Sequence, residues 1–210
     1  MAALIEACED RDFPAHIALV GSNVPGASGL LHAEGKGIPT FAIDQEHFTE
    51  RADFEAELDR RLREARIELV CLAGFMRLLS PDFVAAWRNR LINIHPSLLP
   101  ALPGLRTHER ALEAGVKIHG ATVHFVRAET DQGPIIAQAA VPVLHGDDVE
   151  TIAARVLAVE HRLYPLALQL VASGAAKLAG DVVVLENAGA DPAAALLCPT
   201  DETLFAASER

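Results

Sequence analysis

Apolar, β-branched runs recur along the chain and alternate with amphipathic stretches. Such runs are typical of buried strands, and the periodicity between them is typical of helices that cover a sheet. Strand–helix alternation predicts an α/β fold with a doubly wound, mostly parallel sheet, which binds ligands in the crevice beyond the carboxyl ends of its strands. The predicted strands are residues 16–20, 38–43, 67–73, 91–94, 122–126 and 134–143.

Two stretches have a clear helical face. After His47, apolar residues recur at steps of three to four with charges between them, which predicts an amphipathic helix. Farther on, steps of four and three predict one long helix, and Asp147 and Asp148 lie where they can cap it. The apolar positions are Phe54, Leu58, Leu62 and Ala65 in the first helix, and Ile152, Val156, Val159, Leu163, Leu166 and Leu170 in the second.

The two ends of the chain differ from this pattern. The chain opens in a helix-like segment, residues 2–8, whereas a doubly wound domain normally begins with a strand. Residues 177–185 favour a short hairpin, and the rest of the C-terminus is Ala-rich and loop-like. Since no linker or repeat divides the chain, we expect a single domain over residues 1–185 and a C-terminal tail over residues 186–210.

Composition narrows the class of protein. No apolar run approaches the ~20 residues that cross a bilayer, and the N-terminus has no basic region of a secretory signal. Cys8, Cys71 and Cys198 are widely spaced and form no C-x-x-C pair, so we expect neither disulfides nor a zinc site, and a cytoplasmic location. Cys71 falls in an apolar run and is predicted to be a core thiol. The net charge of −11 argues against a nucleic-acid partner, and local donors would have to hold any anionic substrate.

The most informative motif is L-I-N-I-H-P-S-L-L-P, Leu91 to Pro100. Its apolar start places Asn93 and His95 at the end of a strand and on the same face, and Pro96 and Pro100 stiffen the loop after them. An amide that donates to an oxyanion, beside an imidazole that moves protons, suits acyl-type transfer. Taken alone, however, N-x-H is common by chance, and a structural His is the better interpretation.

A second motif runs from His119 to Ile136, H-G-A-T-V-H-F-V-R-A-E-T-D-Q-G-P-I-I. It predicts a strand followed by a turn that carries Asp131. A loop Asp near a Gly is ordinarily only a turn-former. Here the loop leaves a strand that can neighbour residues 91–94, so we expect the carboxylate to reach His95 and to favour the protonated imidazole.

A third motif, C-L-A-G-F-M-R-L-L-S-P, covers Cys71 to Pro81. Taken alone, it predicts a connection from a strand to a helix that packs on the core. Together, L-A-G-F-M-R-L-L-S-P, N-I-H-P-S-L-L-P, H-G-A-T-V-H-F-V, D-Q-G-P-I-I and A-V-E-H-R-L-Y-P stand in the order and near the spacing of the folate-dependent formyltransferases. From Met1 to about Leu170 the chain most resembles the branch known as phosphoribosylglycinamide formyltransferases.

The resemblance implies a Rossmann-like variant of the α/β fold and a reaction. In that family the formyl group of 10-formyltetrahydrofolate, the co-substrate, is attacked by the amine of glycinamide ribonucleotide in purine (IMP) biosynthesis. No metal and no covalent enzyme intermediate take part. The resemblance therefore implies two small-molecule partners, no nucleic acid, no membrane, and a monomer or homodimer.

The resemblance also implies residue roles. Asn93 would hydrogen-bond the formyl oxygen, His95 would be the general acid, and Asp131 would support His95 and relay a proton through a water. Glu160 would bind the ribonucleotide. For Arg51, placed near the folate tail, a solvated helix charge is nearly as good an interpretation. The residues implied to contact the folate are Arg51, Phe75, Met76, Arg77, Leu78, Leu79 and Asn93.

The chain departs from the family at its start. Family members begin with a strand and a G-x-G-S-N loop that holds the substrate phosphate, whereas residues 1–8 match the helix after that loop. Gly21-Ser22-Asn23 looks similar, but residues 27–39 match the segment after the family's second strand, so we do not place a phosphate site there. We expect that the natural start lies upstream. The alternative is a short chain that lacks a central strand and is inactive.

Other functions stay open. A formyltetrahydrofolate deformylase shares the Asn-His-Asp set, but it carries an N-terminal regulatory domain and tends to have a second His where Pro96 stands. A methionyl-tRNA formyltransferase needs an RNA-binding domain, for which a charge of −11 is unfavourable. An inactive nucleotide-binding module is the non-enzymatic alternative. A Rossmann dehydrogenase is poorly supported, because no G-x-G-x-x-G opens a helix.

Overall fold

The structure is a computed structural model that describes residues 1–186. Cys198 and all of the predicted tail except Glu186 lie outside the described residues, so the division at residue 185 stays a prediction. The described part is an α/β fold, as expected. Its helices are α1 (Ala2–Ala7), α2 (Ser28–Gly35), α3 (Arg51–Glu64), α4 (Pro81–Ala86), α5 (Thr107–Glu113) and α6 (Val149–Ala172), with a 3-10 turn at Gln45–His47.

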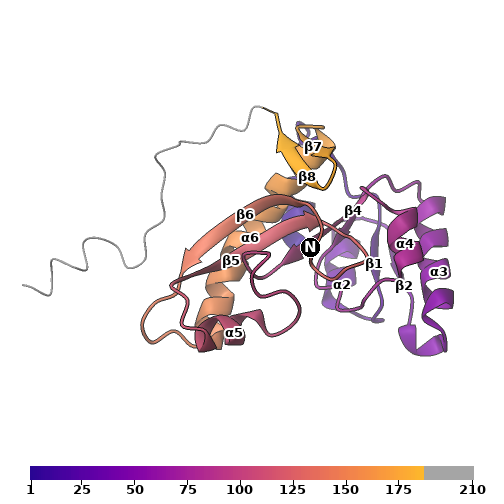
Figure 1. Ribbon diagram of the computed structural model, residues 1–210. Helices are drawn as coiled ribbons and strands as arrows, with labels where there is room; N and C mark the ends of the chain where they lie inside the picture. Colours follow the sequence, from indigo (N-terminus) through magenta and orange to yellow (C-terminus); the bar gives the residue numbers. More distant parts are fainter. Residues whose placement is uncertain (187–210) are drawn as a thin grey trace, which may run out of the picture.

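The strands form three groups (Figure 1). The first is a parallel pair, β1 (Val20–Ser22) with β2 (Thr40–Ala42). The second is a four-stranded sheet in the order β3 (Val70–Leu72), β4 (Leu91–His95), β5 (Ile118–Phe125), β6 (Ile135–Pro142). The third is the predicted hairpin, β7 (Ala176–Ala179) with β8 (Val182–Leu185).

The sheet is parallel only in its first half. β3 and β4 run parallel, whereas β5 pairs antiparallel with both β4 and β6. The parallel strands β3 and β4 are joined by a crossover that contains α4, as parallel strands require, whereas the antiparallel strands β5 and β6 are joined by residues 126–134 without a helix. The strand–helix alternation in the sequence therefore predicted the parallel pairs but not the pairing of β4 with β5, which is antiparallel although α5 lies between them.

Helix α6 packs along β5 and β6 and builds the main core (Figure 1). Asp148 caps it as predicted, because its carboxylate accepts from the Thr151 backbone N–H at 2.8 Å. The predicted apolar seam is correct at Ile152, but Leu166 is 48% exposed. Val156 and Leu163 of the predicted seam are buried as well, and Tyr164, Ala167 and Leu168, which lie outside the predicted seam, are also buried.

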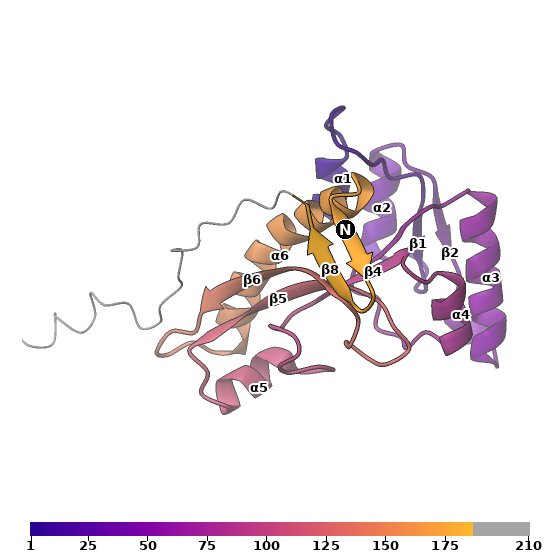
Figure 2. The ribbon, with the colours of Figure 1, turned by 45° about the horizontal axis from the view of Figure 1, so that its top comes forward.

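A second, smaller core lies between α3, α4 and the start of β4. Trp87 is its centre, buried to 1% exposure, stacked on Phe83 and tied by its indole N–H to Asp59 at 2.8 Å. The predicted α3 helix is confirmed. Figure 2 shows β1 and β2 between α2 on one side and α3 on the other.

β1 and β3 differ from the strands that the sequence predicted. The predicted strand 67–73 is reduced to the three residues of β3, whereas the predicted strand 16–20 overlaps β1 at Val20 only, and within residues 1–186 no pairing joins β1 to β3. Each of these strands pairs on one side only, with β2 and β4 respectively. A strand with a partner on one side only forms fewer backbone hydrogen bonds. The paired segment is therefore shorter than the apolar run that predicted it.

Candidate active site

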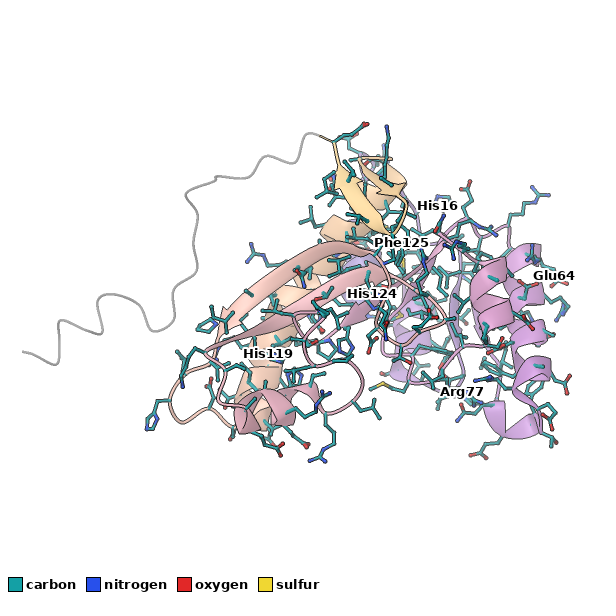
Figure 3. The ribbon with its side chains drawn as sticks, in the orientation of Figure 1. His16, Glu64, Arg77, His119, His124 and Phe125 are labelled. Atoms are coloured by element: carbon teal, nitrogen blue, oxygen red, sulfur yellow. The ribbon has the colours of Figure 1, made fainter. Side chains whose placement is uncertain are left out.

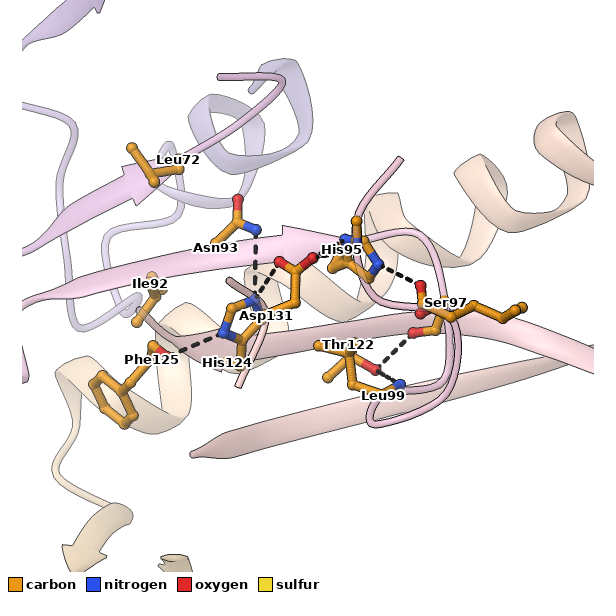
Figure 4. A network of polar contacts seen from close by, with 12 residues as sticks. Leu72, Ile92, Asn93, His95, Ser97, Leu99, Thr122, His124, Phe125 and Asp131 are labelled. Carbon is orange, nitrogen blue, oxygen red and sulfur yellow. Dashed lines mark hydrogen bonds and ion pairs between the residues drawn. The ribbon is translucent and has the colours of Figure 1, made fainter. Parts of the chain in front are cut away.

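The site is built on the face shared by β4 and β5. In the antiparallel register, Asn93 lies opposite His124, and His95 lies opposite Thr122. Since alternate residues of a strand share a face, these four polar side chains are brought together by pairing alone. Figure 4 shows this group with Asp131 reaching it from the loop after β5.

Asp131 lies between two histidines. Its Oδ2 is 3.5 Å from Nδ1 of His95, and its Oδ1 is 3.8 Å from Nε2 of His124. All three side chains are largely shielded from solvent, with exposures of 11% for Asp131, 8% for His95 and 2% for His124. The predicted contact between Asp131 and His95 is therefore present in the fold.

Backbone geometry holds the Asp131 carboxylate in this place. Asp131 has a φ of +57°, in the left-handed region that Asp tolerates better than most residues. Its Oδ2 also accepts from the Gly104 N–H at 2.8 Å, which ties the loop after β5 to the loop after β4. A Cβ at Gly133 would stand 1.6 Å from the Phe125 carbonyl oxygen, so this tight turn requires glycine.

Hydrogen bonds to Thr122 on β5 hold the loop after His95 in place. The Thr122 hydroxyl donates to the Ser97 carbonyl at 2.7 Å and accepts from the Leu99 N–H at 3.0 Å. Gln138 on β6 completes the group, donating to the Leu99 carbonyl at 2.8 Å. These buried bonds hold the backbone beside His95 in one conformation, which a precisely placed imidazole requires.

His95 faces hydrogen-bond acceptors through both ring nitrogens. Nε2 lies 3.1 Å from the Leu102 carbonyl, and Nδ1 faces the Asp131 carboxylate. A carbonyl and an ionised carboxylate can only accept. An imidazolium satisfies both neighbours, whereas a neutral ring directs a lone pair at one of them. The site is thus arranged around a ring that can donate at either nitrogen.

His124 is a site residue that the sequence analysis did not single out. Its Nδ1 donates to the Phe125 carbonyl at 3.0 Å, which leaves Nε2 as the acceptor, 3.5 Å from the Asn93 amide nitrogen. Burial lowers the pKa of His124, and this outweighs the attraction of Asp131, so the ring is neutral at pH 7. It therefore orients the Asn93 amide. The signal was present in the sequence, since His124 alternates with Thr122 in H-G-A-T-V-H-F-V.

A cavity of about 780 Å³ opens at this group. Of the predicted residues, only Arg51 is absent from its lining: it lies on α3, half exposed, with its Nε 3.9 Å from Glu55. Met76 and Leu78 are 82% and 66% exposed at the mouth. The predicted site residues that line the cavity are Phe75, Met76, Arg77, Leu78, Leu79, Asn93, His95, Asp131 and Glu160.

Glu160 and Arg77 line the cavity from different parts of the fold, α6 and the loop after β3. Burial raises the pKa of Glu160, which lies on α6 near the Met1 ammonium. The guanidinium of Arg77 lies over the Phe54 ring at 5.0 Å and donates to Gln45, so its charge is held toward α3 (Figure 3). Arg77 therefore contributes its backbone and stem to the cavity rather than a free charge at the Asn93–His95 group.

The described residues also bear on metal binding, membrane spans and the thiol of Cys71. Among residues 1–186, no group of three or more His, Cys, Asp or Glu side chains is placed to hold a metal ion. No helix of this part is long and apolar enough to cross a membrane. Cys71 is only partly exposed and packs on the main core, where burial raises the pKa of its thiol to about 12.

Comparison with known proteins links this site to one family. The family model "Formyl transferase" matches residues 1–168. The trifunctional purine biosynthetic protein adenosine-3 of Gallus gallus is 52% identical over 84% of this chain, which spans only 18% of that protein. Phosphoribosylglycinamide formyltransferase of Escherichia coli is 45% identical, with 84% of this chain and 83% of that protein aligned.

Solved structures have the same fold. Glycinamide ribonucleotide transformylase 1 from Symbiobacterium toebii aligns with a TM-score of 0.85 at 46% identity, covering 88% of this chain and 87% of that one. A formyltetrahydrofolate deformylase from Pseudomonas syringae aligns with a TM-score of 0.79 at 28% identity, over 88% of this chain and 61% of that one. The family match, the alignments and the fold agree, and the chain belongs to the formyl transferase family.

Proposed function

We propose that this protein transfers the formyl group of 10-formyltetrahydrofolate to the amine of glycinamide ribonucleotide, a step of purine (IMP) biosynthesis. The observation that carries the proposal is the convergence of Asn93, His95 and Asp131 at one open cavity. The similarity to phosphoribosylglycinamide formyltransferase over most of both chains supports the choice of substrates. The reduced thiols of Cys8 and Cys71 accord with a cytoplasmic setting.

The reaction needs an oxyanion site and a proton path. The amine nitrogen attacks the formyl carbon, and the carbonyl electron pair moves onto oxygen to give a tetrahedral intermediate. The intermediate collapses as the bond to N10 of the folate breaks, and the proton lost by the amine is delivered to N10. Formyl group and proton are both conserved, so no oxidant, metal or enzyme-bound intermediate is required for the balance.

Asn93 and His95 are the donors to the developing oxyanion. Neutral His124 accepts from one Asn93 N–H, and this leaves the other amide hydrogen for the formyl oxygen. His95 supplies the second donor, with the Asp131 carboxylate stabilising the imidazolium that forms. Donors held in place before reaction cost no reorganisation, which is why such sites are built on strands rather than on loose loops.

Asp131 has two tasks in this scheme. Its negative charge stabilises protonated His95, and through a bound water it accepts the proton from the attacking amine. Its bond from the Gly104 N–H fixes the carboxylate so that one oxygen faces His95 and the other faces His124. The carboxylate can therefore support the imidazole without swinging into the space of the substrate.

The remaining cavity residues divide between the two substrates. The exposed apolar side chains Met76 and Leu78 are suited to cover the flat pteridine ring, with loop backbone groups meeting its polar edge. Glu160, which lines the same cavity from α6, is suited to accept from ribose hydroxyls of the ribonucleotide. Arg51 at the folate tail stays a prediction, because its side chain points to Glu55.

The test is a formyl-transfer assay on single variants. We expect His95→Ala and Asn93→Ala each to lower kcat by roughly two orders of magnitude, since an oxyanion donor or a general acid typically contributes ~10²-fold or more. Asp131→Asn keeps the shape and removes the charge, and we expect a similar loss. His145→Ala, on an exposed loop, is the matched control with unchanged kcat.

The product identifies the acceptor. Formylated glycinamide ribonucleotide supports the proposal, whereas formate released at the same rate without the amine substrate identifies a deformylase. If His95→Ala and Asn93→Ala both retain near-normal turnover in a folded protein, the assigned roles are wrong. Binding of a folate analogue without turnover of either kind, in a protein with an intact sheet, would identify an inactive member of the family.

A further inference from the structure

The loop of residues 74–80 enters the candidate site from β3. It begins at Gly74, whose φ is +68°, and ends at Ser80, the residue before α4. All of it except Ser80 lines the cavity of about 780 Å³, and its Met76 and Leu78 side chains are 82% and 66% exposed. Side chains this exposed make few packing contacts, so the conformation of the loop depends on the points at which it is attached.

The end of the loop is held by the carboxylate of Glu55 on α3. Its Oε1 accepts from the Ser80 backbone N–H at 2.7 Å, and its Oε2 accepts from the Ser80 hydroxyl. The same hydroxyl oxygen accepts from the Phe83 N–H at 3.2 Å. Because the hydroxyl gives its only proton to Glu55, its lone pairs are directed at Phe83. One carboxylate therefore sets both the last residue of the loop and the start of α4.

The burial of Glu55 shows that its carboxylate serves the loop rather than solvent. Glu55 is 5% exposed, whereas Asp53, two residues earlier on the same helix, is exposed. A buried charge is costly unless it is hydrogen-bonded and paired. The two donors of Ser80 satisfy the carboxylate, and Arg51, one turn earlier, brings its Nε to 3.9 Å from Oε1.

The middle of the loop is held by the neighbouring residue of α3. The Arg77 guanidinium lies over the Phe54 ring at 5.0 Å and donates to Gln45. Phe54 is 2% exposed and packs edge-on against Phe48, with 5.9 Å between the ring centroids. Phe54 and Glu55 are adjacent, so one segment of α3 holds the loop at two points. Figures 1 and 2 both show α3 beside α4, into which the loop leads.

We propose that Glu55 is a positioning residue for the formyl folate: it holds the 74–80 loop in the conformation that binds this substrate. The inference rests on the proposed function, since the loop matters to catalysis only if the folate occupies this cavity. Glu55 does not itself line the cavity, so it acts through Ser80. Its role is in binding, because Asn93, His95 and Asp131 are held by β4, β5 and Gly104 instead.

The test is steady-state kinetics of Glu55→Ala and Glu55→Gln with 10-formyltetrahydrofolate and glycinamide ribonucleotide. We expect Glu55→Ala to raise the KM for the folate about tenfold, because a small displacement of binding groups is costly. We expect kcat and the KM for the ribonucleotide to stay within about twofold of the parent values. Glu55→Gln keeps one acceptor oxygen for Ser80 and should fall between the parent and Glu55→Ala.

This split separates positioning from a purely structural role. A variant that is only less stable loses active protein, which lowers the apparent kcat and leaves both KM values unchanged. The matched control is Asp53→Asn, which removes a charge from an exposed position of the same helix and should behave as the parent protein.

Ser80→Ala tests the same contact from the other side, and it keeps the inference testable if Glu55→Ala does not fold. It removes the hydroxyl bond to Glu55 and leaves the backbone N–H bond. Glu55→Gln and Ser80→Ala alter one contact, so we expect their combined increase in the KM for the folate to be smaller than the product of the single increases.

Hydrogen exchange in the absence of ligand reports on the loop itself. We expect the amides of residues 75–80 to exchange about tenfold faster in Glu55→Ala than in the parent protein, with β5 as the internal control that does not change. This measurement needs no substrate, so it tests the contact between α3 and the loop independently of the proposed reaction.

The outcomes that contradict the inference differ from those that contradict the proposed function. An unchanged KM for the folate in Glu55→Ala and Ser80→Ala, or equal increases in both KM values, overturns the role of Glu55 and leaves formyl transfer standing. Unchanged exchange at residues 75–80 overturns it as well. A parent protein that neither binds nor uses 10-formyltetrahydrofolate overturns the proposed function, and the inference with it.

Discussion

The two halves of this fold differ in how completely their strands are paired. β4 and β5 have neighbours on both sides, and nearly every residue of β5 is buried. β1 and β3 have a neighbour on one side within the described residues, and their side chains are only partly buried. The difference lies in pairing rather than in composition, because the run of residues 67–73 around β3 is at least as apolar as β5, which contains His119, Thr122 and His124.

The candidate site lies in the half whose strands are more completely paired. Asn93, His95 and His124 project from strands whose positions are fixed by partners on each side, and the Asp131 loop is fixed by its bond to Gly104. Sites that must hold donors in place before the reaction are most accurate on such rigid elements. The less complete half supplies the loop of residues 74–79 to the cavity, and the paired half supplies residues 104–108 and the Asp131 loop.

The largest effect on the free energy of unfolding is expected from a matched pair of Leu→Ala substitutions, one in each half. Leu91 on β4 is 1% exposed, whereas Leu69, just before β3, is only partly buried. We expect Leu91→Ala to lower the free energy of unfolding by about 3 kcal/mol and Leu69→Ala by about 1 kcal/mol. Urea unfolding measures both. Equal losses would mean that β3 is packed as tightly as β4, and the contrast between the two halves would be wrong.

A pH-dependent loss of stability is expected from the paired half. His119 on β5 is 1% exposed and contacts His108 at 3.2 Å, and burial, helped by His108 and His95, lowers the pKa of His119 to about 4. The unfolded chain binds this proton near pH 6.5, so stability is full above that pH. It falls by up to about 3 kcal/mol as the pH decreases from 6.5 toward 4.

This pH dependence is checked by denaturant unfolding between pH 4.5 and 7.5. We expect His119→Gln to flatten the profile, while His145→Gln, which alters an exposed loop, leaves it as steep as in the parent protein. Figure 3 places His119 beside α5, away from His124. A profile that stays equally steep in His119→Gln would show that other groups control the acid sensitivity.

The smallest effect concerns the junction between the two halves. The buried Tyr164 hydroxyl of α6 lies 2.8 Å from the Leu72 carbonyl of β3 and 3.1 Å from the Ile92 carbonyl of β4. Tyr164→Phe removes this donor, and we expect a loss of about 1 kcal/mol in stability. Thermal unfolding with hydrogen exchange at residues 70–72 is the measurement, and no change in either would mean that the hydroxyl does not secure β3.

Local patterns in the sequence predicted much of the fold. Period-two and near-continuous apolar runs located the strands, the seam of α6 located its helix, and Asp148 was recognised as its cap. The predicted strand 67–73 was too long and the predicted strand 16–20 met β1 at Val20 only, because apolar character alone does not show where pairing begins and ends. Leu166 was misplaced for a related reason, since the face that α6 buries shifts along its length.

The candidate site was predicted unevenly. Asn93 and His95 were predicted to lie together because residues two apart on a strand share one face. Asp131 was predicted to reach them because it lies on the turn that comes after the next strand. His124 was not singled out, although it lies directly opposite Asn93, because the register of an antiparallel pair depends on both strands and their connection. The position of Arg77 against Phe54 depends on how α3 packs, and this packing cannot be predicted from a sequence motif.

The sequence by itself determined most of the element types, the family, and the residues proposed for the candidate site, since these depend on periodicity, spacing and local turn chemistry. Tertiary structure decided which strands pair, how His124 orients Asn93, and how α3 holds the loop after β3. The reason is physical: pairing and burial are contacts between residues distant in the chain, and no single segment contains the information about its partner.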